Sequence, residues 1–124
     1  MAKITTNFSL EEFKCKDGSD IPNKELSNII ILAKQLQVLR DTIDKPIQIN
    51  SAYRSPKHNA KIGGVKNSQH VKGKASDITV KGMTPKEVAL VIEGLIEKGK
   101  MLQGGIGIYA TFVHYDIRGT KARW

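Results

Sequence analysis

The sequence is poor in cysteine and aromatic residues, and it has no long apolar run. Cys15 is the only cysteine, so an intrachain disulfide is excluded. Three Phe, three Tyr and one Trp are too few for a platform that stacks single-stranded nucleic acid. No apolar stretch is long enough to span a membrane, and residues 1–7 lack the apolar region of a secretory signal. We therefore expect cytoplasmic synthesis without a signal peptide and no membrane insertion.

Acidic residues are also scarce, with 12 Asp and Glu against 20 Lys and Arg, which gives a net charge of +8. This excess of positive charge indicates an anionic partner, either a nucleic acid or a bacterial wall with its carboxylates and phosphate polymers. The length of 124 residues and the 40% hydrophobic content are typical of one globular domain. We expect a single domain over residues 1–124 that works as a monomer.

The lone thiol of Cys15 has two interpretations. It could be a nucleophile with His58, His70 or His114 as its base. The favoured interpretation is a small buried hydrophobic residue beside Phe13, because no nucleophile motif surrounds it.

Three stretches carry helix signals. Ser9 and Glu12 form a capping box at the start of a short helix. Apolar residues at helical spacing predict a long helix that starts with Asn23 as N-cap and stops before Pro46. Thr84, followed by Pro85 and Glu87, begins a further helix that ends at Gly99.

Four stretches alternate as strands do, namely 47–54, 75–80, 104–109 and 112–117, the last two as a hairpin. The glycines at the start of the 104–109 strand suggest that another group approaches closely. Helices early and strands late predict an α+β domain whose small antiparallel sheet has helices packed on one face.

Three of the four strands divide into an apolar face and a face with a potential catalytic group. In the last strand Val113 and Ile117 lie opposite His114 and Asp116. The other two strands divide in the same way: Asp77 lies opposite Ile78 and Val80, and Arg54 and Asn50 lie opposite Ile47 and Ile49.

The polar faces supply a possible metal site. Two imidazoles and a carboxylate, from His70, His114 and Asp77, form a typical catalytic zinc set with one coordination position open. Asp116 is the candidate base, and Arg54 would hold a substrate carboxylate or an oxyanion. Arg118 is a weaker candidate for either role.

Structural roles remain open for the same residues. Asp77 could simply bond to backbone N–H groups. His114 could be a hydrogen-bonded sheet histidine, and Asp116 could pair with Arg118 on the surface. His58 is a solvated loop residue in this interpretation.

The metal motif resembles a known family. Residues 68–77, SQHVKGKASD, match the pattern S-x-H-x-x-G-x-A-x-D of the zinc D-Ala-D-Ala carboxypeptidases and related phage endolysins. The resemblance extends to three further features of that family. Its N-terminal entry is matched by residues 8–13, its arginine-bearing strand end by residues 51–56, and its closing hairpin by residues 105–109 and 112–116. The resemblance implies the fold class shared by lysostaphin, D-Ala-D-Ala peptidases and hedgehog proteins.

The resemblance also implies roles for individual residues. Zinc would lie on His70, Asp77 and His114, Arg54 would contact substrate, and Ser68 and Gln69 would line the substrate side. Several relatives carry the acidic base three residues before the last histidine, where this chain has Thr111. Asp116 fits the sub-group with a His-x-Asp ending.

Three hypotheses follow. The first is a zinc-dependent peptidase that hydrolyses peptidoglycan stem peptides, as a D-Ala-D-Ala carboxypeptidase or endopeptidase, and acts at the wall after release as a phage or prophage lysis enzyme. The second is a catalytically inactive, zinc-containing wall-binding module. The third, which we rank last, is a nucleic-acid binder whose affinity falls steeply with salt and does not depend on His70.

Overall fold

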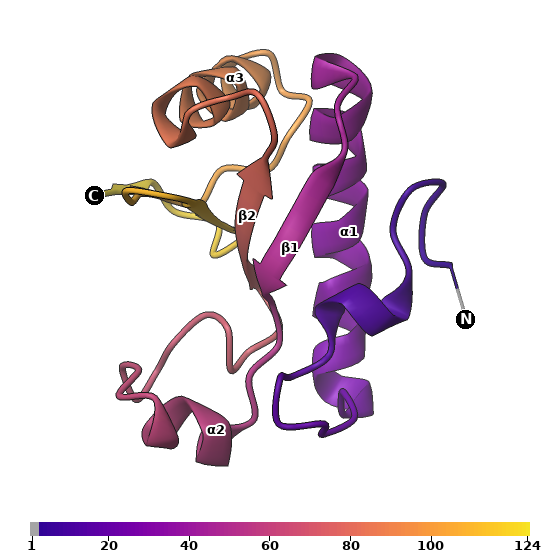
Figure 1. Cartoon of the computed structure of the whole chain (residues 1–124), viewed down its shortest axis with the longest axis vertical. Helices are drawn as coiled ribbons and strands as arrows, with labels where there is room; N and C mark the ends of the chain where they lie inside the picture. The colour runs from indigo at the N-terminus through magenta and orange to yellow at the C-terminus, as the bar shows by residue number, and fades with distance from the viewer. Residues whose placement is uncertain (1–2) are drawn as a thin grey trace.

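The computed structural model describes residues 3–124, which form four helices and five strands (Figure 1). In chain order these are the 3-10 helix η1 (Leu10–Phe13), α1 (Asn23–Ile43), β1 (Ile47–Ser51), α2 (Pro56–Lys61), β2 (Ala75–Val80), α3 (Pro85–Glu97), β3 (Gly105–Ile108), β4 (Val113–Asp116) and β5 (Ala122–Arg123).

Two of the three predicted helix starts are confirmed, and the third is displaced by one residue. Ser9 and Glu12 form the capping box of η1, and Thr84 and Glu87 form that of α3. The helix α1 begins at Asn23 itself rather than after it. It ends where Asp44 adopts the left-handed conformation, with a φ of 51°, shortly before Pro46.

The strands form one sheet in the order β1-β2-β4-β3-β5. Every neighbouring pair is antiparallel except β3 and β5, which are parallel, so the sheet is mixed rather than purely antiparallel. The strand β5 was not predicted, because two residues are too short to show alternation. Its pairing closes the edge of β3 and brings the end of the chain beside the hairpin.

The core lies between one face of the sheet and the helices α1 and α3, as predicted. The sheet contributes alternating residues to it, and these share one apolar cluster with the buried stripe of α1. Burial of that face leaves the opposite face free for polar side chains. The sheet residues of the core are Ile47, Ile49, Ile78, Val80, Ile106, Val113 and Tyr115.

The strand β1 is shorter than the predicted 47–54. Its pairing with β2 shifts register between Ile49 and Ser51, and the strand ends there. Beyond it both Ala52 and Tyr53 are buried, so the alternation no longer assigns faces. Arg54 therefore lies in a loop, where its backbone N–H donates to the carbonyl oxygen of His70 at 3.1 Å.

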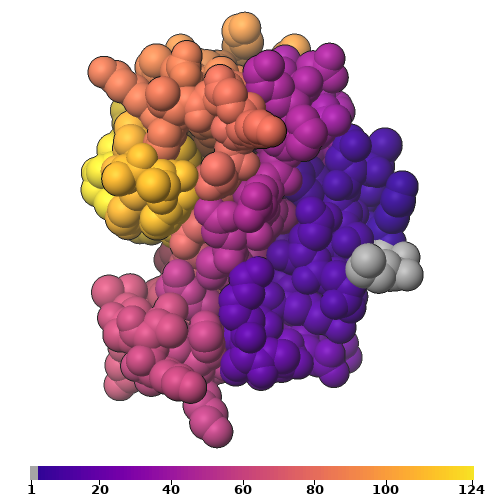
Figure 2. All heavy atoms as spheres, in the orientation of Figure 1, coloured from indigo at the N-terminus to yellow at the C-terminus, as the bar shows by residue number. Residues whose placement is uncertain are grey.

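Seen as solid spheres, the C-terminal strands and the segment with α2 are two projections on the same side of the molecule (Figure 2). The outline is notched between them, and α1 with the N-terminal segment forms the opposite side (Figure 2). Within residues 3–124, no helix is long and apolar enough to cross a membrane.

Truncating Leu36, which is fully buried in α1, should lower the free energy of unfolding. We expect Leu36→Ala to cost about 2–5 kcal/mol through lost burial and a residual cavity. Leu90→Ala is the matched control, since Leu90 is 64% exposed in α3. Urea unfolding followed by circular dichroism measures both, and equal losses would contradict this assignment of the core.

Candidate metal centre

Strand register brings the first two candidate ligands together. In the antiparallel pair of β2 and β4, Asp77 is the direct partner of His114. Both residues point to the face that the helices leave free. Their side chains meet, with His114 Nδ1 lying 3.2 Å from Asp77 Oδ1.

The third candidate ligand comes from the loop between α2 and β2. The ring of His70 reaches back so that its Nε2 lies 3.2 Å from the same Asp77 Oδ1. His70, Asp77 and His114 each offer a ligand atom, all within 4.8 Å of one another, and all three residues are buried. The structure thus gathers the three residues that the sequence selected.

Hydrogen bonds on the outer nitrogens fix which nitrogen of each ring faces the centre. His70 Nδ1 lies 2.8 Å from the carbonyl oxygen of Ala52, which can only accept a hydrogen bond. His114 Nε2 lies 2.7 Å from Asp116 Oδ2, which is likewise an acceptor. Both outer nitrogens are therefore protonated, and the lone pairs of the inner nitrogens point at Asp77.

Three electron-rich atoms then face one another without a hydrogen between them. Burial raises the pKa of Asp77, but the neighbouring His114 and His70 rings outweigh this and hold the pKa well below its ordinary value. Burial lowers the pKa of His114, but the neighbouring carboxylates of Asp116 and Asp77 outweigh this effect and raise the pKa. A cation at the point where the three atoms converge satisfies all of them, which is the requirement of a metal site.

Asp116 lies behind His114, away from this point. It is fully buried, and its carboxylate accepts hydrogen bonds from Gly105 N–H and from the Arg118 guanidinium at 2.8–3.1 Å. Burial raises the pKa of Asp116, but bonds from His114 and Arg118 outweigh it and hold the pKa well below its ordinary range.

This position does not suit the general base that the sequence suggested for Asp116. A base must reach a reactant at the open side of the metal point, whereas Asp116 contacts the opposite nitrogen of the His114 ring and does not line the cavity. Asp116 and His114 are two residues apart on one strand and therefore share a face. This proximity places the Asp116 carboxylate against the His114 ring and not in the cavity. The geometry is that of a carboxylate that orients a ligand.

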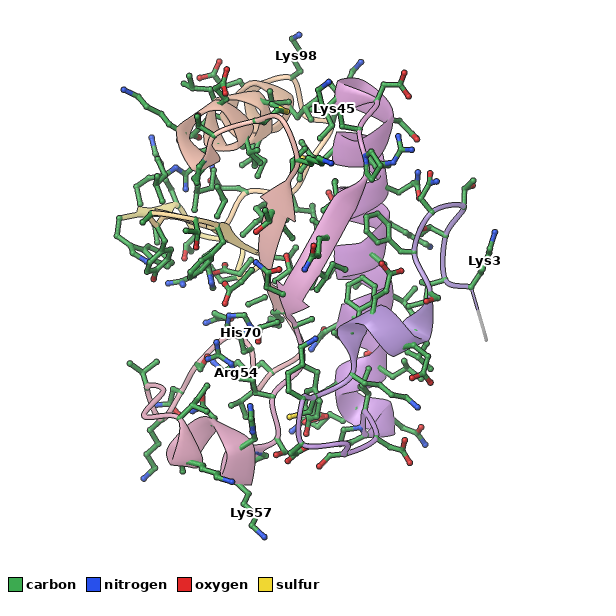
Figure 3. All side chains as sticks on the ribbon, in the orientation of Figure 1. Lys3, Lys45, Arg54, Lys57, His70 and Lys98 are labelled. Atoms are coloured by element: carbon green, nitrogen blue, oxygen red, sulfur yellow. The ribbon has the colours of Figure 1, made fainter. Side chains whose placement is uncertain are left out.

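Arg54 lies beside His70, one of the candidate ligands (Figure 3). Its guanidinium donates to Ser51 Oγ and Asn59 Oδ1, each at 3.3 Å, and lies 3.5 Å from Asp77 Oδ2. Its side chain is only 16% exposed, so the cation is directed along the wall of the site.

The loop that carries His70 is fixed by its own polar contacts. Ser68 Oγ accepts a hydrogen bond from the backbone N–H of His70 at 3.1 Å. Gly73 adopts a positive φ of 72°, and a Cβ there would lie 2.8 Å from the carbonyl oxygen of Glu25. The serine and glycine of the ten-residue motif thus shape the turn that places the histidine.

A cavity of about 450 Å³ opens over the metal point. It lies between the C-terminal strands and the segment that follows α2, the notch seen in Figure 2. All three candidate ligands and the predicted substrate residues line it, while Asp116 does not. The lining residues are Arg54, Val65, Asn67, Ser68, Gln69, His70, Asp77, Tyr109, Phe112, His114, Arg118 and Trp124.

The aromatic wall of this cavity was missed from the sequence. Trp124 packs against His114 with ring centroids 5.0 Å apart, lies under the Arg118 guanidinium, and donates to Tyr109 OH at 2.7 Å. A Cβ on Gly107 would lie 2.5 Å from the Trp124 ring. The glycines of the β3 strand predicted that another group approaches closely, and this contact confirms it. The sequence did not indicate that the group is Trp124.

A buried His-His-Asp set with orienting acceptors, at the floor of a polar cavity on a small α+β fold, defines a mononuclear metallopeptidase-type centre. The chain belongs to the Peptidase M15 family, which it matches over residues 4–116. It is 38% identical over 53 residues to the zinc D-Ala-D-Ala carboxypeptidase of Streptomyces albus G, across 42% of this chain. The chain corresponds to about a fifth of that relative, since the match covers 21% of it.

Asp116→Asn should weaken metal binding without removing it. The neutral amide no longer stabilises the outer N–H of His114, so we expect zinc affinity to fall about 10–100-fold. Competition with a chromophoric chelator measures the affinity, with circular dichroism as a check on folding. Asp44→Asn is the matched control, because that side chain is 97% exposed. Unchanged affinity in Asp116→Asn would contradict the orienting role.

Proposed function

We propose that the protein is a zinc-dependent peptidase that hydrolyses peptidoglycan stem peptides. The observation that carries this proposal is the convergence of two imidazole lone pairs and one carboxylate at the floor of an open cavity. The family and the zinc-dependent relative support the same chemistry.

The residues present fit zinc. Their donors are two nitrogens and one oxygen, the tautomers leave the inner lone pairs free, and the cavity leaves one side of the point accessible. His70 Nε2, Asp77 Oδ1 and His114 Nδ1 would hold the ion. Zinc in such a set supplies Lewis acidity toward a peptide carbonyl and lowers the pKa of water.

The chain's own residues position the substrate. Arg54 presents a fixed guanidinium at the cavity wall, where it would bind a substrate carboxylate or the oxyanion that develops at the scissile carbonyl. Gln69 and Ser68 line the same side. Arg118 is drawn toward Asp116 and Trp124, which leaves it a smaller share in substrate binding than Arg54.

The relative is named for D-Ala-D-Ala carboxypeptidase activity, and we extend that substrate class to this chain. Either removal of a terminal D-Ala or cleavage within a stem peptide suits a cavity open to solvent. The excess of positive charge favours accumulation on an anionic wall, in keeping with a phage or prophage lysis enzyme.

Digestion of purified muropeptides tests the function. Zinc-loaded protein should shorten them, chelator treatment should abolish the activity, and added zinc should restore it. Mass spectrometry of the products separates loss of a terminal alanine from internal cleavage. If zinc-loaded, folded protein releases nothing from any muropeptide, the peptidase proposal fails.

Arg54→Gln should reduce kcat/KM on muropeptides by about 10²–10³, the usual cost of removing a preorganised donor to a developing charge. The control is Lys57→Gln, because Lys57 lies in the same segment and its side chain extends into solvent (Figure 3). Zinc content should be unchanged in both variants. Similar losses in both would indicate a general effect of charge instead.

The wall-binding alternative has one observation in its favour. Among the described residues that line the cavity, Asp77 is the only carboxylate, and it is a ligand candidate rather than a base. Retention on purified cell walls, together with no product from muropeptides, would support this second function.

A further inference from the structure

A second group of metal-ligating side chains lies outside the cavity. Cys15, Asp17 and His58 each offer a ligand atom within 4.8 Å of the other two. Cys15 and Asp17 belong to the loop after η1, which runs alongside the start of α2, where His58 lies (Figure 1). None of the three lines the cavity described above.

Ser55, the N-cap of α2, organises this group. Its backbone N–H donates to Cys15 Sγ at 3.3 Å, and its hydroxyl donates to Asp17 Oδ2 at 2.7 Å. The other carboxylate oxygen, Asp17 Oδ1, accepts from Ser19 N–H at 2.8 Å. Metal ligands are commonly oriented by hydrogen bonds from groups outside the metal site. The bonds to Cys15 Sγ and to the Asp17 carboxylate are contacts of this kind.

Burial differs across the group in a way that suits an ion. Cys15 is only 4% exposed, whereas Asp17 is exposed and His58 is half-buried. A metal can therefore enter from the solvent side and meet the sulfur at the base. The same burial argues against Cys15 as a nucleophile with His58 as its base, because a peptide substrate does not reach an enclosed thiol.

We infer that Cys15, Asp17 and His58 form a second zinc site. Thiolate, imidazole and carboxylate together suit zinc, whereas magnesium and calcium prefer oxygen ligands alone. Binding releases the Cys15 thiol proton to solvent and forms a bond from sulfur to zinc, with no change of oxidation state. Unlike the first centre, this one contains sulfur.

The position of this site gives it a structural consequence. Phe13 accepts a backbone hydrogen bond from Tyr53 N–H at 3.0 Å, so the N-terminal segment already touches the residue before Arg54. An ion on Cys15 and His58 would join the same segment to α2. It would thereby fix the start of the loop that forms one wall of the cavity.

Cobalt substitution tests the inference, because a thiolate bound to cobalt absorbs in the near ultraviolet and the His-His-Asp centre has no sulfur. Full-length protein, kept reduced, is depleted of metal and titrated with cobalt. We expect the band in the wild type and in His70→Ala, and its loss in Cys15→Ser. Zinc content after dialysis should fall from two ions per chain to one in Cys15→Ser and in His58→Ala.

Asp17→Asn, compared with Asp20→Asn, tests the third ligand. Asp20 is also exposed, but it pairs with Lys14 rather than with the cluster. We expect cobalt affinity at the thiolate site to fall about 10-fold or more in Asp17→Asn and to stay unchanged in Asp20→Asn, because an amide is a poorer ligand than a carboxylate.

Two results would overturn the inference. One is a wild-type protein with no thiolate band. The other is a band and cobalt content that His58→Ala leaves unchanged, which would indicate an adventitious ion on the thiol only. Neither result touches the first centre, whose zinc depends on His70 and not on Cys15, so the two proposals fail separately.

Discussion

The pairing register of β2 against β4 is the constraint from which the candidate metal centre follows. It makes Asp77 and His114 direct partners on the face that the helices leave free, and it makes Ile78 and Val113 partners on the core face. A slip of one residue would turn both polar side chains into the apolar core. Burial of the apolar face therefore fixes the register, and the fixed register places two of the three ligands.

The same arrangement concentrates buried polar groups, which a fold tolerates only when each has a partner. The Ala52 carbonyl and Asp116 satisfy the outer nitrogens of the two rings, and Arg118 neutralises Asp116 in turn. These contacts leave the inner nitrogens and Asp77 to be satisfied by one shared cation. The outer hydrogen bonds thus orient both rings before a metal binds, and the stability of this region is linked to metal binding.

The cavity over the centre depends on contacts between segments distant in the sequence. Its polar wall comes from Arg54 and the loop after α2, and its aromatic wall comes from the hairpin and Trp124. Gly107 permits the indole to pack closely across β3. Ser55, the residue after Arg54, makes hydrogen bonds to Cys15 and Asp17, so the proposed second site is tied to the segment that carries Arg54.

The sequence by itself indicated the two capping boxes, the apolar faces and the His-Asp-His set of candidate ligands, because capping, periodicity and a ten-residue motif are local properties. It also proposed Arg54 as a residue that contacts substrate. Tertiary structure alone decided that Asp116 contacts the outer nitrogen of His114 and does not line the cavity, that Trp124 forms a wall, and that Cys15 lies near His58. It also decided the parallel pairing of β5 with β3. Each of these depends on the direction of a side chain or on contact between distant segments, and neither is encoded in the spacing of residues along one strand.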